Sequence, residues 1–187
     1  MSAKTKKVGL LPVGDFSPLV SKVIATHIAA YLKLAVEILP RRELPRETLD
    51  TQRLQCDAAV LLKLFEKTAP AFCSKIIAVV GVDLFVPLFT HVLGEAEQNG
   101  RIAIVSLYRL GENNTGRNWA ADGVSLERAA KVTLHELGHL FNLWHCADTQ
   151  CLMRFSSDIA EVDLTPMQFC RYCRVFLRDS LTPPGHF

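Results

Sequence analysis

Runs of consecutive apolar residues recur through the first part of the chain and are separated by mixed segments. Continuous apolar runs of about four to eight residues are typical of strands buried in a parallel sheet. We predict such strands at Val8–Val13, Val36–Leu39, Lys75–Val80 and Arg101–Leu107. The segment Phe85–Glu97 begins apolar and becomes acidic, which is consistent with an edge strand within it.

Helical spacing of apolar residues appears between these runs. Ser17 is a suitable N-cap for a helix that reaches about Leu34, and Thr51–Phe65 predicts a second helix. Ser125–Phe141 contains few helix breakers and predicts the longest helix. The chain is then irregular until a last helix, for which the expected cap, first-turn residue and end are Thr165, Pro166 and Arg178.

Alternating strands and helices predict an α/β fold with a mixed, mostly parallel sheet. A length of 187 residues suits one domain, because domains commonly have roughly 100–200 residues. We therefore predict a single domain over residues 1–187. Its N-terminal part covers about residues 1–142, and its smaller, irregular C-terminal part covers about residues 143–187.

Composition limits the possible partners and the compartment. Apolar residues make up 49% of the chain and charged residues 21%, as in a compact globular protein. The net charge is only +2 and no Lys/Arg stripe is present, so we expect no nucleic-acid partner. No secretory signal and no run of ~20 apolar residues is visible, which predicts a cytoplasmic protein without membrane association. We also expect a monomer, although no sequence pattern determines the oligomeric state. Its six cysteines are then more compatible with thiols or metal ligands than with disulfides.

The clearest chemical motif lies in the longest predicted helix. His135 and His139 are four residues apart, so their imidazoles lie on one helix face and suit a zinc ion. Glu136, next to the first histidine, can reach a zinc-bound water without binding the metal. We therefore assign it the role of general base.

A third ligand is expected at His145, six residues after His139. A straight helix would carry His145 to another side, so the chain must turn near Asn142. Asn is the best residue after Gly for the left-handed conformation that ends many helices. Three histidines leave one zinc position open, as in catalytic sites. Other HExxH enzymes take a later acid as third ligand, and Asp158 and Glu161 are the alternatives here.

The run HELGHLFNLWHC and the Cys and Met residues after it resemble the archaemetzincin signature. The matching residues are His135, Glu136, His139, Asn142, His145, Cys146, Cys151, Met153, Cys170 and Cys173. Asn142 departs from the pattern, which has Gly there. The resemblance implies a compact metzincin-like domain and a zinc peptidase acting on peptides or proteins, in the form of an aminopeptidase or short-peptide peptidase. It also implies that Met153 is the methionine of the Met-turn beneath the zinc.

The four late cysteines form a C-x4-C pair and a C-x2-C pair. This spacing suits a closed, tetrahedral structural zinc site, which would tie the irregular segment to the last helix. The expected ligands are Cys146, Cys151, Cys170 and Cys173, so we predict two zinc ions per chain. A disulfide pair and a redox CxxC are the alternatives. Cys56 and Cys73 are isolated in apolar surroundings and are expected to be buried.

These features predict hydrolysis of a peptide bond by a water that zinc and Glu136 activate together. The competing hypothesis is a catalytically weak or inactive zinc protein that binds peptides or a protein partner. An intact Glu136 argues against it, because a binding module does not need a general base. Substrate specificity is expected from the segments Phe85–Asn99 and Gly111–Gly123. His91 has no partner at ligand spacing and is expected to be structural.

Overall fold

The computed structural model describes residues 7–111 and 121–182. Its main sheet has five strands in the order β2-β1-β5-β9-β8. β1, β2, β5 and β9 run parallel, and β8 pairs antiparallel with β9 at the edge of the sheet. The strands span Lys7–Val13 (β1), Ala35–Ile38 (β2), Lys75–Val80 (β5), Gly94–Ala96 (β8) and Ile102–Ser106 (β9). The predicted α/β class and the mostly parallel sheet are confirmed, and so is the edge strand in the segment Phe85–Glu97.

A second sheet of four strands has the order β3-β4-β6-β7. β6 and β7 form an antiparallel hairpin, and β4 lies parallel to β6. The strands span Leu49–Asp50 (β3), Gln55–Asp57 (β4), Leu84–Val86 (β6) and Phe89–Val92 (β7), and the short 3-10 helix η1 spans Arg46–Thr48. The hairpin leads directly into β8, so it sits beside the edge of the main sheet.

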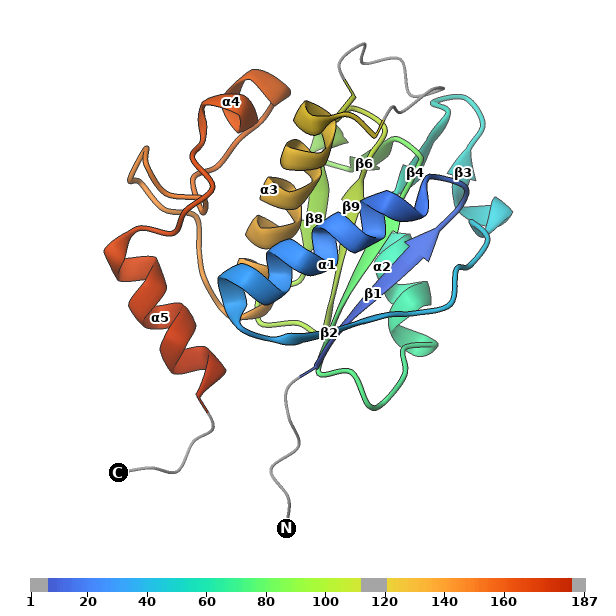
Figure 1. Cartoon of the computed structure of the whole chain (residues 1–187). Coiled ribbons are helices and arrows are strands. Elements are labelled where there is room, and N and C mark those ends of the chain that lie inside the picture. Colours follow the sequence, from blue (N-terminus) through green and yellow to red (C-terminus); the bar gives the residue numbers. More distant parts are fainter. Residues whose placement is uncertain (1–6, 112–120, 183–187) are drawn as a thin grey trace.

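Helices cover both faces of the main sheet (Figure 1). α1 (Pro18–Leu32) and α3 (Gly123–Leu140) pack on one face, and α2 (Ala58–Lys67) packs on the other. Each face therefore has its own apolar core. The larger core is continuous from α1 and α3 to the C-terminal residues. The C-terminal part of the chain therefore packs on the N-terminal layers through this core, and burial of apolar surface stabilises the contact.

The predicted helix Thr51–Phe65 is wrong in its first part. Leu54 has a φ of 55°, a left-handed conformation that interrupts a helix. The next residues form β4, and α2 begins only at Ala58. The Asp57 carboxylate caps α2 by accepting hydrogen bonds from the amides of Ala59 and Val60. Apolar spacing alone did not locate this cap.

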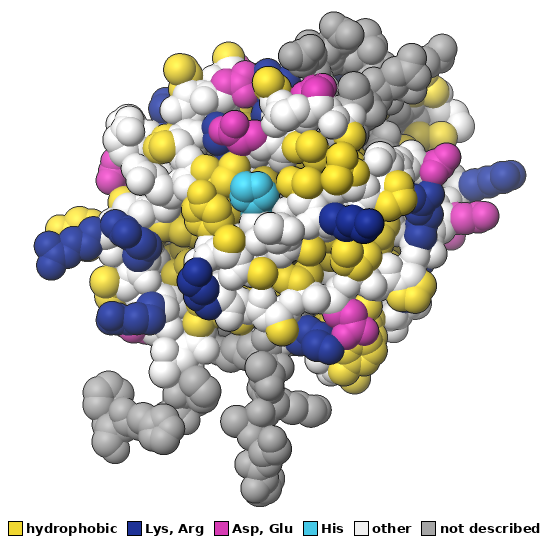
Figure 2. Space-filling model, viewed as in Figure 1, with side chains coloured by type: hydrophobic (Ala, Val, Ile, Leu, Met, Phe, Trp, Pro, Cys, Tyr) yellow, Lys and Arg dark blue, Asp and Glu magenta, His cyan; other side chains and the backbone are white. Residues whose placement is uncertain are grey.

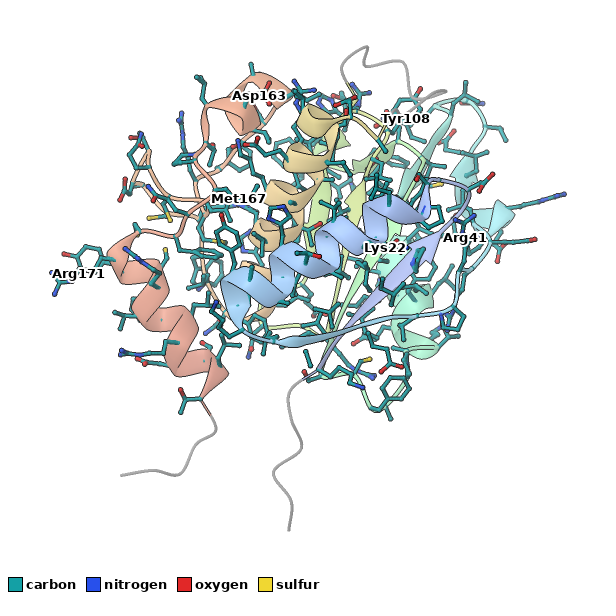
Figure 3. All side chains as sticks on the ribbon, in the orientation of Figure 1. Lys22, Arg41, Tyr108, Asp163, Met167 and Arg171 are labelled. Atoms are coloured by element: carbon teal, nitrogen blue, oxygen red, sulfur yellow. The ribbon has the colours of Figure 1, made fainter. Side chains whose placement is uncertain are left out.

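The predicted start of the last helix at Thr165 is also wrong. A short helix, α4 (Ile159–Leu164), precedes it, and Thr165 ends that helix by donating its hydroxyl to the carbonyl of Glu161. The last helix, α5 (Arg171–Leu181), is capped instead by the sulfur of Cys170. Met167 lies between the two helices and packs against the larger core beside α3 (Figure 3). The C-terminal part is thus less irregular than predicted.

The surface has no dominant charge on the face that Figure 2 presents. Lys and Arg side chains are scattered there among apolar and acidic ones. Within the described residues, no helix has the length and apolar character needed to cross a membrane. Of the predicted loop Gly111–Gly123, residues 112–120 lie outside the described part of the chain.

Candidate metal centre

α3 presents the first two histidines of the motif on one face. The helix is capped at its start by Asp122, whose carboxylate accepts from the amide of Ser125 at 2.7 Å. One turn separates His135 from His139, and their Nε2 atoms lie 3.1 Å apart. Two imidazole nitrogens so close, without a carboxylate between them, are suited to a shared cation.

The chain turns after α3 and returns a third histidine to the same point. Asn142 has a φ of 67°, the predicted left-handed conformation. The amide of Leu143 donates to the carbonyl of Gly138 at 2.9 Å, and the amide of Asn142 donates to that of His139 at 2.9 Å. This pattern is a Schellman motif, with Asn in the place usually taken by Gly. His145 thereby joins the other two, and the three ligand atoms lie within 4.8 Å of one another.

Hydrogen bonds fix the orientation of the two helical imidazoles. Nδ1 of His135 pairs with the carbonyl of Leu152 at 2.8 Å, and Nδ1 of His139 pairs with that of Leu143 at 2.9 Å. Since a carbonyl only accepts, each Nδ1 carries the proton and each Nε2 has a free lone pair. Burial lowers the pKa of His135 to about 3, so this ring stays neutral and able to bind a metal at neutral pH. The donor set therefore fits zinc.

Glu136 lies beside the three histidines without belonging to their cluster. It is buried at the edge strand β8, where a Cβ atom on Gly94 would lie 2.6 Å from its Oε1. Gly94 therefore leaves the space that this carboxylate occupies. Burial, and to a smaller extent the charge of Glu95, raises the pKa of Glu136 well above its usual value. A cation held by the histidines opposes this effect and favours the carboxylate.

Met153 packs directly beneath the helix that carries the histidines. It is fully buried, and its carbonyl accepts from the amide of Cys146 at 2.8 Å. A Cβ atom on Gly138 would overlap the Met153 sulfur and would lie 2.9 Å from its methyl carbon. Glycine at this position thus allows the thioether to approach the helix between His135 and His139.

Gly138→Ala should destabilise the protein although alanine is the better helix former. The added methyl must displace Met153, and overpacking of this kind costs about 1–3 kcal/mol. Thermal unfolding of the zinc-loaded variant measures this loss. Gly138→Ala combined with Met153→Ala should lose less stability than the two single variants added together, because the overlap is then removed. Unchanged stability in the single variant would show that the thioether is not held there.

The four late cysteines converge in a second cluster, and their sulfurs lie within 4.8 Å of one another. All six cysteines of the chain are free thiols. Cys146 and Cys170 have their sulfurs 3.9 Å apart, and Cys151 accepts a hydrogen bond from the amide of Cys170. Burial raises the pKa of Cys151 and of Cys173, so a bound cation is needed to keep these sulfurs as thiolates. The arrangement fits a closed zinc site of four thiolates rather than a disulfide.

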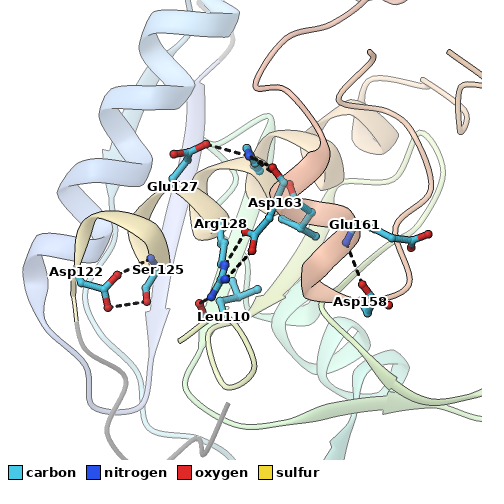
Figure 4. Close-up of polar contacts among 10 residues, drawn as sticks. Leu110, Asp122, Ser125, Glu127, Arg128, Asp158, Glu161 and Asp163 are labelled. Carbon is cyan, nitrogen blue, oxygen red and sulfur yellow. Dashed lines mark hydrogen bonds and ion pairs between the residues drawn. The ribbon is translucent and has the colours of Figure 1, made fainter. Parts of the chain in front are cut away.

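The alternative third ligands have other roles in the structure. Asp158 caps α4 by accepting from the amide of Glu161 (Figure 4). The Glu161 carboxylate in turn accepts from the amide of Ser157. Neither belongs to the metal-ligand clusters of the described residues. Local capping therefore accounts for both acids.

The three histidines open into a cleft of about 380 Å³. One wall is the chain from β7 through β8 to Gln98, which includes His91, and the floor is α3. The opposite wall contains Trp144, residues 155–157 and the end of α4. The predicted specificity segment Phe85–Asn99 thus reaches the cleft. His91, expected to be only structural, lines it as well.

Polar contacts that the sequence did not reveal, one an ion pair and one a set of hydrogen bonds, support both walls. Arg128 of α3 forms two hydrogen bonds, of 2.8 and 2.6 Å, with the Asp163 carboxylate at the end of α4 (Figure 4). On the other side, Gln55 joins the Asp83 carboxylate, at 2.8 Å, to the carbonyl of Thr90 in β7. Both pairs link residues that are far apart in the chain, so no local pattern marks them.

Known proteins provide an independent assignment. The sequence profile of peptidase family M54 matches residues 20–179. The chain belongs to peptidase family M54. The chain is 31% identical to the archaemetzincin of Methanocaldococcus jannaschii. The alignment covers 92% of this chain and 93% of that protein.

Solved structures extend the likeness to the whole fold. The crystal structure of archaemetzincin from Methanopyrus kandleri matches with a TM-score of 0.83 and 31% identity, covering 97% of this chain and 98% of that chain. A zinc-dependent peptidase from Methanocorpusculum labreanum matches with a TM-score of 0.81 and 29% identity, covering 91% and 99%. This M54 member is therefore a zinc metallopeptidase, and the resemblance drawn from its sequence is confirmed.

Proposed function

We propose that the catalytic zinc of this peptidase is held by His135, His139 and His145, and that Glu136 is its general base. The observation that carries the proposal is the convergence of three imidazole nitrogens within 4.8 Å at the floor of an open cleft. A buried carboxylate lies next to them and takes no part in their cluster. Three protein ligands leave a fourth position for water or substrate.

The residues around this position divide the work of peptide-bond hydrolysis. Zinc bound there supplies Lewis-acid polarisation of the scissile carbonyl and lowers the pKa of water. Glu136 accepts a proton from the attacking water and then donates it to the leaving amine. The carbonyls of Leu143 and Leu152 hold the imidazoles in the tautomer that leaves Nε2 free. Met153 supports the helix from below.

The position of β8 at the edge of the main sheet is an argument for an extended peptide as the substrate. β8 pairs with β9 on one side only, and its residues line the cleft on the other. An exposed strand edge binds an extended peptide through main-chain hydrogen bonds. A substrate strand added to β8 would cross the cleft directly above the three histidines.

We also propose a second, structural zinc at Cys146, Cys151, Cys170 and Cys173. Support comes from the clustering of the four sulfurs within 4.8 Å and from the position of Cys146 directly after His145. A zinc clip there ties the third histidine to α5. Aminopeptidase or short-peptide activity, a monomeric state and a cytoplasmic location stay predictions from sequence.

The experiment for the proposed function is cleavage of a peptide library by the zinc-loaded protein, followed by mass spectrometry. The library contains each peptide with a free and with an acetylated N-terminus. We expect cleavage, and an aminopeptidase would spare the acetylated set. Binding of peptides without any cleavage would support the competing hypothesis of an inactive zinc protein.

A further inference from the structure

Two large aromatic side chains that line the cleft with the third histidine are exposed. Trp144 is 71% exposed and directly precedes His145, and Phe155 is 49% exposed. The Phe155 ring makes an edge contact with His145, with ring centroids 5.1 Å apart. Trp and Phe bury large areas when they are bound, so exposing them in a cleft costs free energy in the free protein. Exposed apolar side chains at a concave site mark a binding surface.

A third aromatic residue lies across the same cleft. Phe89 of β7 is 52% exposed and belongs to the wall opposite Trp144 and Phe155. The main-chain edge of β8 belongs to the same wall as Phe89, and the proposed substrate strand runs along this edge. A substrate side chain next to the scissile bond would therefore meet aromatic surface beside His145.

The charges of the cleft argue against an acidic side chain in that position. Lys131 is the only Lys or Arg among the described residues that line it, and its ammonium group is already paired. It forms an ion pair with Glu127 at 2.9 Å and donates to the carbonyl of Val162 at 3.2 Å. The carboxylates of Glu95 and Glu136 also line the cleft. Apart from a zinc ion at the three histidines, an acidic substrate side chain would find like charges and no unpaired Lys or Arg among the described lining residues.

We propose that Trp144 and Phe155 form an aromatic subsite that selects peptides with a large apolar, preferably aromatic, side chain adjacent to the scissile bond. The proposal rests on the proposed peptidase function and names the substrate class of that site. Trp144 supplies most of the contact surface. Phe155 has a second role, because it also packs against the ring of His145.

The test uses zinc-loaded full-length protein and peptides that differ only at the residues flanking the cleaved bond, where Phe, Leu, Ala or Glu is placed. For the wild type, kcat/KM should be about tenfold or more higher with Phe than with Ala, and lowest with Glu. Trp144→Ala should reduce the Phe-to-Ala ratio to about twofold, and Trp144→Phe should restore part of it. Phe176→Ala, at an exposed aromatic residue of α5 outside the cleft lining, is the matched control and should keep the wild-type ratio.

The outcomes separate this inference from the proposed function. If the wild type cleaves Phe and Ala peptides equally, or if Trp144→Ala keeps the full preference, the aromatic subsite is wrong while the peptidase assignment stands. If the wild type cleaves nothing, the proposed function fails, and calorimetry with the same peptides tests the subsite alone. Tighter binding of the Phe peptide that is lost in Trp144→Ala supports it, and equal binding of the Phe and Ala peptides overturns it.

Discussion

Glu136→Gln should lower peptide hydrolysis by about 10²–10⁴-fold while the zinc content stays unchanged. The amide has nearly the same volume as the carboxylate, so it fits the space beside Gly94 without repacking. It cannot accept the proton of the attacking water. All three imidazoles remain, so the metal should stay bound.

The comparison needs a control for the loss of a carboxylate in general. Glu66→Gln changes an exposed residue of α2, on the opposite face of the sheet, and should keep both activity and zinc. His145→Ala should differ from both variants, because it removes a ligand and lowers zinc occupancy together with activity. Wild-type rates in Glu136→Gln would mean that another group is the base.

Cys173→Ser should release close to one zinc per chain and lower the thermal unfolding temperature by about 10 °C or more. Cys173 is buried at the start of α5 and is one of four converging sulfurs. Metal binding free energy is folding free energy in such sites, with apparent values of about 10–16 kcal/mol for structural zinc. In a protein of this size, each kcal/mol of lost folding free energy lowers the unfolding temperature by about 2–4 °C. A loss of a few kcal/mol therefore gives the expected shift.

Cys73→Ser is the matched control, since Cys73 is equally buried but lies outside the cluster. It should lower stability modestly and keep the zinc content. The same loss of zinc is expected for Cys146→Ser, Cys151→Ser and Cys170→Ser. If all four variants in the cluster keep the zinc and the unfolding temperature of the wild type, the four thiols do not hold a structural metal.

Sequence patterns located the parts of the molecule that depend on local chemistry. The predicted strand Lys75–Val80 matches β5 residue for residue, because the five residues after Lys75 are buried and apolar, as in a strand covered on both faces. The turn at Asn142 is predictable because few residues other than Gly and Asn tolerate the positive φ that it adopts. The ligand spacing of His135 and His139 follows from the period of the helix.

Other features depend on neighbours that are distant in the chain. The helix predicted from Thr51 begins only at Ala58. The residues just before it form β4, which pairs with β6, although their apolar spacing is that of a helix. The bond from Arg128 to Asp163 and the buried contact of Gln55 with Asp83 build the two walls of the cleft. Each depends on the folded arrangement, so local sequence patterns do not predict the walls of the cleft.

Stepwise zinc removal, with cleavage and metal content measured on the same samples, tests the central claim most directly. The account predicts two zinc ions per chain. The open site of three histidines should lose its metal first, and peptide cleavage should fall in proportion while the fold is kept. Adding back one equivalent of zinc should restore cleavage. Full cleavage after loss of the first zinc, or a preparation with full activity and no metal at the histidines, would contradict the account.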